Sequence, residues 1–278
     1  MANCSCSGVR SCLICEEKNC VISSKNDNPN EENLSLKKNL HFCNKCKKLY
    51  RKTQFNCKCN VDNHSDLFHP NLASGIRVIE NFITRDEEDM ILKVIDQFPW
   101  RMSQSGRRKQ DFGPKVNFKR RKLKSGNFTG LPKFCEFIVQ RLHSNVVHMN
   151  DFHPVELCNL EYCPERGSSI DPHIDDIWVW GERLVTVNLL SNTALTLTHS
   201  DITSEVQIPM PRRSLIILEG EARHRWMHGI KREHVTSRRI AITLRELSEE
   251  FLTGETYSTI RESLLQIAST FNGQPSSM

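Results

Sequence analysis

The chain has 278 residues, of which 38% are apolar and 26% are charged, and its formal net charge is +5. This length and composition fit a soluble globular protein with one main domain of about 200 residues and a smaller appendage. No apolar run approaches the roughly 20 residues of a membrane span, and the start of the chain lacks the apolar core of a signal peptide. We therefore expect a protein of the cytoplasm and nucleus without a membrane partner.

Most of the cysteines lie in the first 59 residues, in two sets of mirrored spacing. The sets are Cys4-x-Cys6 with Cys12-x-x-Cys15, and Cys43-x-x-Cys46 with Cys57-x-Cys59. Four thiolates at such spacing favour tetrahedral zinc, so we expect Zn(II) here; the alternative is a tail whose thiols hold no metal. A polar stretch, 23–38, reads as a linker. Cys135, Cys158 and Cys163 fit buried apolar positions without a chemical role.

The pattern changes near residue 70, where a strand over 75–79 is expected. A helix follows, opened by the capping box of Thr84 and Glu87. Its predicted buried stripe consists of Met90, Ile91, Val94 and Ile95. A second helix is expected in 131–147, with Phe134, Ile138 and Leu142 on its apolar side.

Short strands separated by turn residues dominate the chain after residue 155. They are expected at 156–163, 184–190, 194–199, 205–208, 214–218, 223–226 and 239–245. A last helix is expected at 259–271. Helices followed by many short strands indicate an α+β protein whose core is a double-stranded β-helix, or jelly roll, with supporting N-terminal helices. The expected divisions are 1–69 (Cys-rich segment and linker), 70–254 (main domain) and 255–278 (C-terminal helix and tail).

Three His-x-Asp triplets occur, against about 0.5 expected by chance from this composition, so the triplet alone is weak evidence. His173-Ile174-Asp175 differs from the others in its context. In an extended segment its imidazole and carboxylate share one face. A non-haem Fe(II) oxygenase needs two histidines and one carboxylate on one side of the metal. His228 is the expected distal histidine, with His224 as its rival.

An alternating strand, Arg239-Ile-Ala-Ile-Thr243-Leu-Arg245, comes shortly after His228. Its two arginines and Thr243 should point to one face. Buried arginines on a strand otherwise made of apolar residues are costly unless they meet anions. A dicarboxylate supplies such anions, because arginine binds a carboxylate through two hydrogen bonds.

The segments "YCPERGSSIDPHID", "HGI" and "RRIAITLR" together resemble the AlkB family of Fe(II)- and 2-oxoglutarate-dependent dioxygenases. The segment "SQSGRRKQDFGPKVNF" and the Cys-rich start look like the fourth AlkB homologues of animals. The resemblance implies Fe(II) ligated by His173, Asp175 and His228, and 2-oxoglutarate contacted by Arg239, Arg245, Tyr162, Thr243 and Asn159. Ala241 and Leu160 stand where many members have Asn, so contacts to the 2-oxo end fall to Asn159 or Asn188.

The segment 106–125 carries nine Lys and Arg residues against one acid, which would attract an acidic or nucleic-acid partner. It sits where the family places its substrate lid. The residues expected to contact substrate are Arg107, Arg108, Lys109, Phe112 and Lys115.

The resemblance implies oxidative removal of a methyl group from a protein lysine, in actin, with release of formaldehyde, succinate and CO2. The alternative substrate is N6-methyladenine in DNA. A non-catalytic zinc-containing adaptor on a degenerate jelly roll is an alternative of another class.

Overall fold

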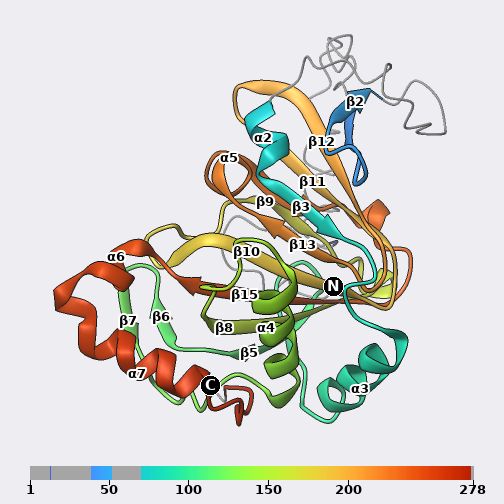
Figure 1. Cartoon of the computed structure of the whole chain (residues 1–278). Coiled ribbons are helices and arrows are strands. Elements are labelled where there is room, and N and C mark those ends of the chain that lie inside the picture. Colours follow the sequence, from blue (N-terminus) through green and yellow to red (C-terminus); the bar gives the residue numbers. More distant parts are fainter. Residues whose placement is uncertain (1–12, 14–38, 52–69, 277–278) are drawn as a thin grey trace, which may run out of the picture.

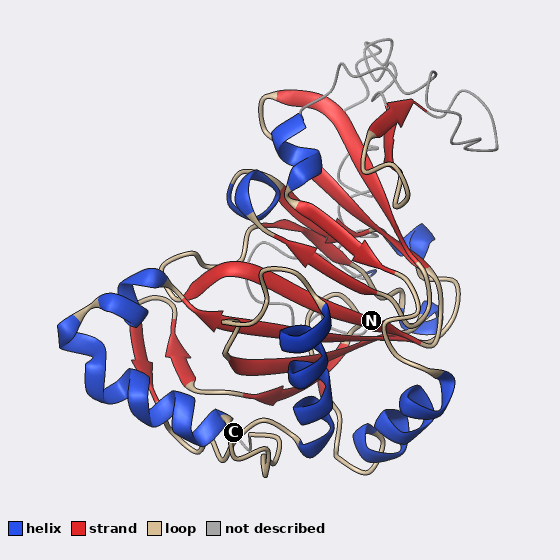
Figure 2. Ribbon diagram, viewed as in Figure 1, coloured by secondary structure: helices blue, strands red, loops and turns tan. Residues whose placement is uncertain are grey.

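Two β-sheets face each other, and most of the helices lie outside the larger sheet (Figure 1, Figure 2). The computed structural model describes residue 13, residues 39–51 and residues 70–276. Among these residues no helix is long and apolar enough to cross a membrane.

The major sheet has seven strands. In spatial order they are β3 (Ile76–Ile79), β13 (Leu215–Leu218), β10 (Trp180–Leu189), β15 (Arg239–Leu247), β8 (Pro154–Tyr162), β5 (Arg108–Phe112) and β4 (Arg101–Met102). A separate hairpin, β6 (Lys115–Asn117) and β7 (Lys122–Lys124), stands beside it.

The minor sheet has six strands. In spatial order they are β2 (Leu49–Arg51), β1 (Asn39–Phe42), β12 (Ile202–Met210), β11 (Thr193–His199), β14 (Met227–Ile230) and β9 (Ile170–His173). From β8 to β15 the chain passes repeatedly between the two sheets, and every pairing among these strands is antiparallel. This winding fits the expected jelly-roll core.

Two apolar clusters hold the layers together. One lies between the major sheet and the helices, where Ile91, Ile138, Val185 and Leu264 pack together. The other fills the space between the sheets around Leu197, Ile216 and other aliphatic side chains. The expected helix residues Phe134, Ile138 and Leu142 are all buried on α4 (Lys133–Asn145), which confirms that prediction.

Helix α3 (Arg85–Ile95) begins with the predicted capping box. Thr84 Oγ1 accepts a 3.2 Å hydrogen bond from the Glu87 N–H, and Glu87 Oε2 accepts one of 2.8 Å from the Thr84 N–H. The predicted stripe was wrong for Met90, which is 44% exposed. Glu88 takes the inward position instead, because its carboxylate accepts the Leu190 N–H at 2.7 Å.

The strand predicted at 223–226 was also wrong. Its first residues belong to the short helix α5 (Gly220–His224), and the strand β14 starts at Met227. Gly220 precedes the turn into this helix with a φ of 55°, a conformation that glycine adopts without strain. The β-like composition of the segment therefore did not determine its structure.

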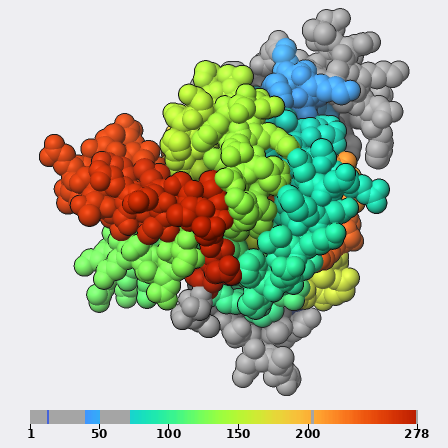
Figure 3. Space-filling model, turned by 60° about the horizontal axis from the view of Figure 1, so that its bottom comes forward, coloured from blue at the N-terminus to red at the C-terminus, as the bar shows by residue number. Residues whose placement is uncertain are grey.

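The remaining helices are short or lie near the C-terminus. They are α2 (Pro70–Ser74), α6 (Glu249–Thr253), α7 (Ser258–Ala268) and the 3₁₀ turns Pro164–Arg166, Arg232–His234 and Glu255–Tyr257. In the space-filling view the C-terminal segment, in red, lies against the green segments that precede β8 (Figure 3). Leu264 and Ala268 of α7 are buried in the core under the major sheet.

Part of the expected Cys-rich segment joins the minor sheet. Strand β1 runs parallel to β12, and β2 pairs with the other edge of β1. The described residues of this segment are thus continuous with the sheet, and the division at residue 69 stays a prediction.

Candidate active site

Two histidines from adjacent strands meet between the sheets. His173 ends β9 and is paired in register with His228 of β14, and their ring centroids are 4.4 Å apart. A Cβ added at Gly229 would lie 2.8 Å from the Ile170 carbonyl oxygen, so glycine is what lets these strands approach closely here. Asp175 follows two residues after His173. One potential ligand atom from each of His173, Asp175 and His228 lies within 4.8 Å of the others.

The hydrogen bonds and burial of the three side chains suit a divalent metal. His173 Nδ1 donates to the Asp171 carbonyl oxygen at 2.8 Å, which leaves Nε2 as the free lone pair, 3.4 Å from Asp175 Oδ1. Burial, followed by the nearby His173, lowers the pKa of His228 to about 3, so its imidazole is neutral. His228 Nδ1 is buried and has no hydrogen-bond partner.

Asp175 is held as a carboxylate. Burial alone would raise its pKa, but the charge of Arg245 lowers the pKa well below its usual value. Arg245 Nε donates to Asp175 Oδ2 at 2.8 Å, while its Nη1 donates to Glu156 Oε2 at 2.6 Å. Two imidazole nitrogens and one ionised carboxylate form the donor set that non-haem Fe(II) takes.

The rival histidine does not belong to this group. His224 Nε2 pairs with Glu182 Oε2 at 2.7 Å, and its side chain is 36% exposed. The structure therefore favours His228 over His224 as the distal histidine.

A buried guanidinium lies deeper in the same cavity. Arg239 is 2% exposed, its Nε donates to Asn188 Oδ1 at 2.7 Å, and its Nη1 has no partner. Its guanidinium carbon lies 4.7 Å from the centre of the Tyr162 ring. A buried donor without an acceptor is costly, and an anionic ligand would satisfy it.

The cavity around these groups is mostly apolar. Its walls include Leu160, Leu184, Leu195, Met210, Ile216, Leu218, Ile230 and Ala241. Thr243 also lines it and lies 3.2 Å from the Thr186 hydroxyl. His173, Asp175, His228, Arg239 and Arg245 line the same space. The structure thus gathers the residues expected to bind iron and most of those expected to bind the co-substrate.

Asn159 is the exception. It lies on the other face of β8, where its Nδ2 donates to Gln110 Oε1 at 3.0 Å, and it does not line the cavity. Strand alternation explains the error, because Leu160 and Tyr162 take the inward positions. Asn188 lies beside Arg239, but its Nδ2 already donates to the carbonyl oxygens of Ser191, Met210 and Pro211. Asn188 therefore orients Arg239.

No protein-family model matches the chain. A human protein named "Alpha-ketoglutarate-dependent dioxygenase alkB homolog 4" is 39% identical over 99% of this chain and 96% of its own length. A Caenorhabditis elegans protein named "DNA N6-methyl adenine demethylase" is 40% identical over 69% of this chain and 67% of its own length. The solved structure named "The structure of OsALKBH1" matches with a TM-score of 0.46 at 13% identity, over 62% of this chain and 96% of that one.

The chain belongs to the AlkB family of 2-oxoglutarate-dependent dioxygenases. Membership implies Fe(II) and 2-oxoglutarate as cofactors. The two imidazoles and the carboxylate fit the iron. The Arg239 guanidinium, whose Nη1 has no hydrogen-bond partner, fits a carboxylate of 2-oxoglutarate. Family membership therefore favours an enzyme over the non-catalytic adaptor.

The lid residues expected from the AlkB resemblance are not all at the surface. Phe112 is fully buried in the core and packs edge-on against Phe98, so it cannot cover a substrate. Arg107 is 2% exposed, and its Nε donates to the Gln104 carbonyl oxygen at 3.1 Å. Phe112 is buried because β5 is a strand of the major sheet, paired with β8, and Arg107 directly precedes this strand.

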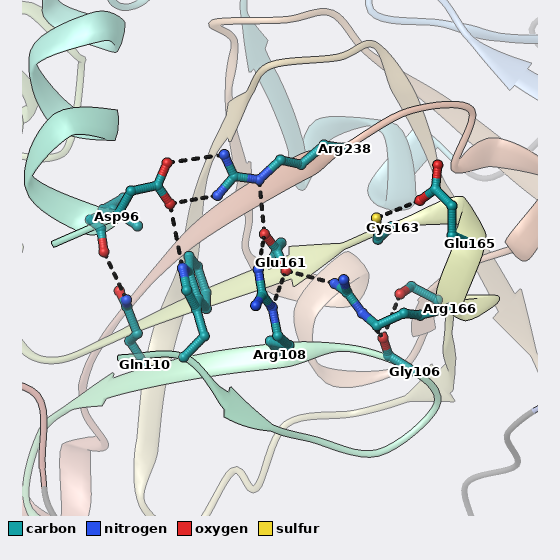
Figure 4. A network of polar contacts seen from close by, with 12 residues as sticks. Asp96, Gly106, Arg108, Gln110, Glu161, Cys163, Glu165, Arg166 and Arg238 are labelled. Atoms are coloured by element: carbon teal, nitrogen blue, oxygen red, sulfur yellow. Dashed lines mark hydrogen bonds and ion pairs between the residues drawn. The ribbon is translucent and has the colours of Figure 1, made fainter. Parts of the chain in front are cut away.

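Arg108 is engaged in a polar network outside the cavity (Figure 4). Its Nη2 donates to Glu161 Oε1 at 2.8 Å, and the buried Glu161 carboxylate also accepts from Arg166 and Arg238. Arg238 pairs in turn with Asp96 on α3. Glu161 thus joins β5, β8 and the segment before β15, a structural role that the sequence interpretation missed.

Lys109 and Lys115 do reach a groove. Lys109 Nζ lies 2.8 Å from Asp111 Oδ2, and both lysines line the groove together with Asp111, Phe118 and Glu156. Glu156 connects this groove to the cavity, since it shares Arg245 with Asp175. The sequence interpretation missed Glu156, although strand alternation puts it on the same face of β8 as Tyr162.

The cysteine sets are only partly described. Cys4, Cys6, Cys12, Cys15, Cys57 and Cys59 lie outside the described residues. Cys43 and Cys46 stand in the turn between β1 and β2. The Cys43 N–H donates to the Lys48 carbonyl oxygen at 3.0 Å, and the Lys47 N–H donates to the Cys43 carbonyl oxygen at 2.9 Å.

Proposed function

We propose that this AlkB-family chain is an oxidative N-demethylase that acts on a methylated lysine of a protein, with actin as the substrate that the family resemblance implies. The observation that carries the proposal is a single cavity that holds the His173, Asp175 and His228 donors and, deeper, the Arg239 guanidinium, whose Nη1 has no hydrogen-bond partner. Iron(II) with 2-oxoglutarate and dioxygen supplies the oxidant for the methyl carbon; the products are formaldehyde, succinate and CO2.

The side chains divide the work between them. His173, Asp175 and His228 hold the iron, and Arg245 keeps Asp175 ionised and oriented. Arg239 binds the distal carboxylate of 2-oxoglutarate, with Asn188 fixing the guanidinium. The aliphatic walls exclude water from the reacting atoms, which protects the reaction from side reactions.

The groove beside the cavity supports a cationic substrate. Asp111 and Glu156 put two carboxyl groups on its wall, where they pair with Lys109 and Arg245, and Phe118, 53% exposed, adds an aromatic face. A methylated lysine ammonium is attracted both by carboxylates and by aromatic faces. Glu156 accepts a hydrogen bond from Arg245, which also donates to Asp175. A lysine side chain bound in the groove would therefore point toward the iron ligands.

N6-methyladenine in DNA is the second candidate. The hairpin β6–β7 carries Lys115, Lys122 and Lys124, and its connecting turn carries the exposed Lys119, Arg120 and Arg121. This basic hairpin borders the same groove, and it would neutralise phosphates. The name of the Caenorhabditis elegans relative points to the same chemistry in that protein.

The test compares both substrates in one assay. The full chain is supplied with Fe(II), 2-oxoglutarate and either a monomethyl-lysine actin peptide or an N6-methyladenine oligonucleotide, and formaldehyde and succinate are measured. The proposal expects equal amounts of formaldehyde and succinate with the peptide, and neither product with Asp175→Ala. Formaldehyde from the oligonucleotide alone would replace the lysine assignment with the DNA one.

For the cysteines we propose one zinc ion per set of four thiols, with Cys43 and Cys46 supplying two ligands of the second ion. Lys47, the residue after Cys46, has a φ of 59°, and the tight turn it makes brings the chain back to β2. Metal analysis of the full chain should find two zinc ions per molecule, and Cys43→Ser should lose one of them.

A further inference from the structure

A third arginine lies next to the iron ligands without touching the cavity. Arg223 on α5 is 1% exposed. Its Nη1 donates to the Asp175 carbonyl oxygen at 3.0 Å, while Nη2 and Nε donate to the Trp180 and Gly181 carbonyl oxygens, each at 3.3 Å. Among the described residues no carboxylate lies within ion-pair distance of it.

The three acceptors lie on one short stretch of chain, the loop after β9 and the start of β10. This stretch starts at Asp175 and ends at the first residues of β10, and α5 lies just before β14, which carries His228. A planar guanidinium has five N–H donors in fixed directions, so it can set the relative positions of several carbonyls at once. Arg223 therefore ties the segment that delivers His228 to the loop that delivers Asp175.

Other contacts already connect α5 to β10. The Gly220 N–H donates to Glu182 Oε1 at 2.6 Å, and His224 pairs with Glu182 Oε2. Those contacts are at the surface. Burying a cation without a carboxylate partner costs free energy. Arg223 is buried in this way even though surface hydrogen bonds already connect α5 to β10. Its distinctive contact is the one to Asp175.

Asp175 is thus held at two points. Arg223 fixes its backbone carbonyl, and Arg245 fixes Oδ2 of its side chain, so Oδ1 stays directed toward His173 Nε2. Trp180 links the two arginines: its carbonyl accepts from Arg223, and its ring lies 5.9 Å from the Arg245 guanidinium carbon. We propose that Arg223 is a positioning residue that sets the orientation of the Asp175 ligand through its main chain. This inference rests on the proposed iron site.

The test uses the full chain under anaerobic conditions. Fe(II) is titrated at saturating 2-oxoglutarate, and the visible charge-transfer band reports the metal bound together with the co-substrate, separately from any iron held by the cysteines. Contacts that orient metal ligands typically contribute 10- to 100-fold to affinity, so Arg223→Gln should raise the Fe(II) midpoint at least about tenfold and shift the band. Arg223→Lys, which keeps the charge but loses the planar spread of donors, should fall between Arg223→Gln and wild type.

The matched control is Arg183→Gln. Arg183 is also a poorly exposed arginine at the start of β10, but it pairs with Glu246 and Asp151. It should lower the melting temperature of the metal-free protein and leave the Fe(II) midpoint unchanged. A folded Arg223→Gln with a wild-type midpoint and band would overturn the proposal. If Arg223→Gln does not fold, an Fe(II) midpoint of Arg223→Lys equal to that of wild type would overturn the proposal as well. Absence of the band in wild type would count against the proposed function instead.

Discussion

His173 and His228 are direct partners across an antiparallel pair of strands, with their ring centroids 4.4 Å apart. The register of β9 and β14 alone thus brings together two histidines that are far apart in the chain. Asp175 joins them because the chain continues past β9 in a loop held by Arg223 and Arg245. The candidate metal site is therefore built from sheet pairing and two arginine contacts.

Substitution of Arg239 should weaken co-substrate binding, whereas substitution of its neighbour Arg238 should not. Neighbouring strand residues face opposite sides, and Arg239 enters the cavity while Arg238 pairs with Glu161 and Asp96. Hydrogen bonds to a charged group contribute about 1.5–3 kcal/mol, so Arg239→Met should raise the KM for 2-oxoglutarate about 10- to 100-fold. Arg238→Gln should leave this KM unchanged. Steady-state kinetics with varied 2-oxoglutarate measures both; equal KM values for the two variants would refute the assignment.

The metal-free protein should lose stability as the pH falls. His228 has a folded pKa of about 3 against an ordinary value of 6.5, so between these values the unfolded chain binds a proton that the folded chain does not. The free energy of unfolding then falls with falling pH, at most by about 1.4 kcal/mol per pH unit from this group. The carboxyl of Asp175, with its lowered pKa, adds to the fall in more acidic solution.

Urea unfolding of the metal-free chain between about pH 7 and about pH 5 measures this slope. His228→Asn removes the titrating imidazole and should flatten the profile. A slope identical to that of wild type would show that His228 is not buried in its neutral form.

The strand pattern of the jelly roll was readable because apolar residues alternate or run continuously in β8, β10, β13 and β15. The triad residues were readable because His-x-Asp, a distant histidine and two strand arginines are chemically unusual together. The face of a strand on which a side chain lies was harder to predict. Asn159 was placed one position off the cavity face, and only the register of β8 against β15 shows that Leu160 and Tyr162 point inward.

The basic segment was misread for a different reason. The segment 106–125 was expected to form a substrate lid, yet part of it is strand β5, which pairs with β8, and Phe112 and the preceding Arg107 are buried. Long-range pairing overrides local composition in this way. Arg223 and Glu156 left no signal of their own in the sequence, since their roles depend on contacts between elements far apart in the chain.

Phe112 should matter for stability rather than for substrate binding. It is fully buried between α3 and the major sheet, and Phe→Ala substitutions in cores typically cost about 3–5 kcal/mol. Phe112→Ala should therefore lower the free energy of unfolding by this amount. Phe118→Ala is the matched control, because Phe118 is 53% exposed beside the groove and should change the substrate KM with little effect on unfolding. The reverse pattern would restore Phe112 as a lid residue.

Glu161 should contribute strongly to stability. Its carboxylate is 1% exposed and accepts from three arginines, and their hydrogen bonds lower its pKa to about 2 against the opposing effect of burial. Breaking a buried ion pair from one side typically costs about 3–5 kcal/mol. Glu161→Gln should reduce the free energy of unfolding by a comparable amount in urea titration, while Glu136→Gln, which removes an exposed pair with Lys133, should change it by less than about 1 kcal/mol. Equal effects would show that the network adds nothing to stability.

The most direct measurement is an anaerobic titration of the full chain with Fe(II) and 2-oxoglutarate, following the visible metal-to-ligand charge-transfer band. The proposed iron site predicts a saturable band in wild type and in His224→Ala, and no band in His173→Ala or His228→Ala, with all four proteins folded. A folded wild-type protein that gives no band, or a band that survives in His228→Ala and disappears in His224→Ala, would contradict it.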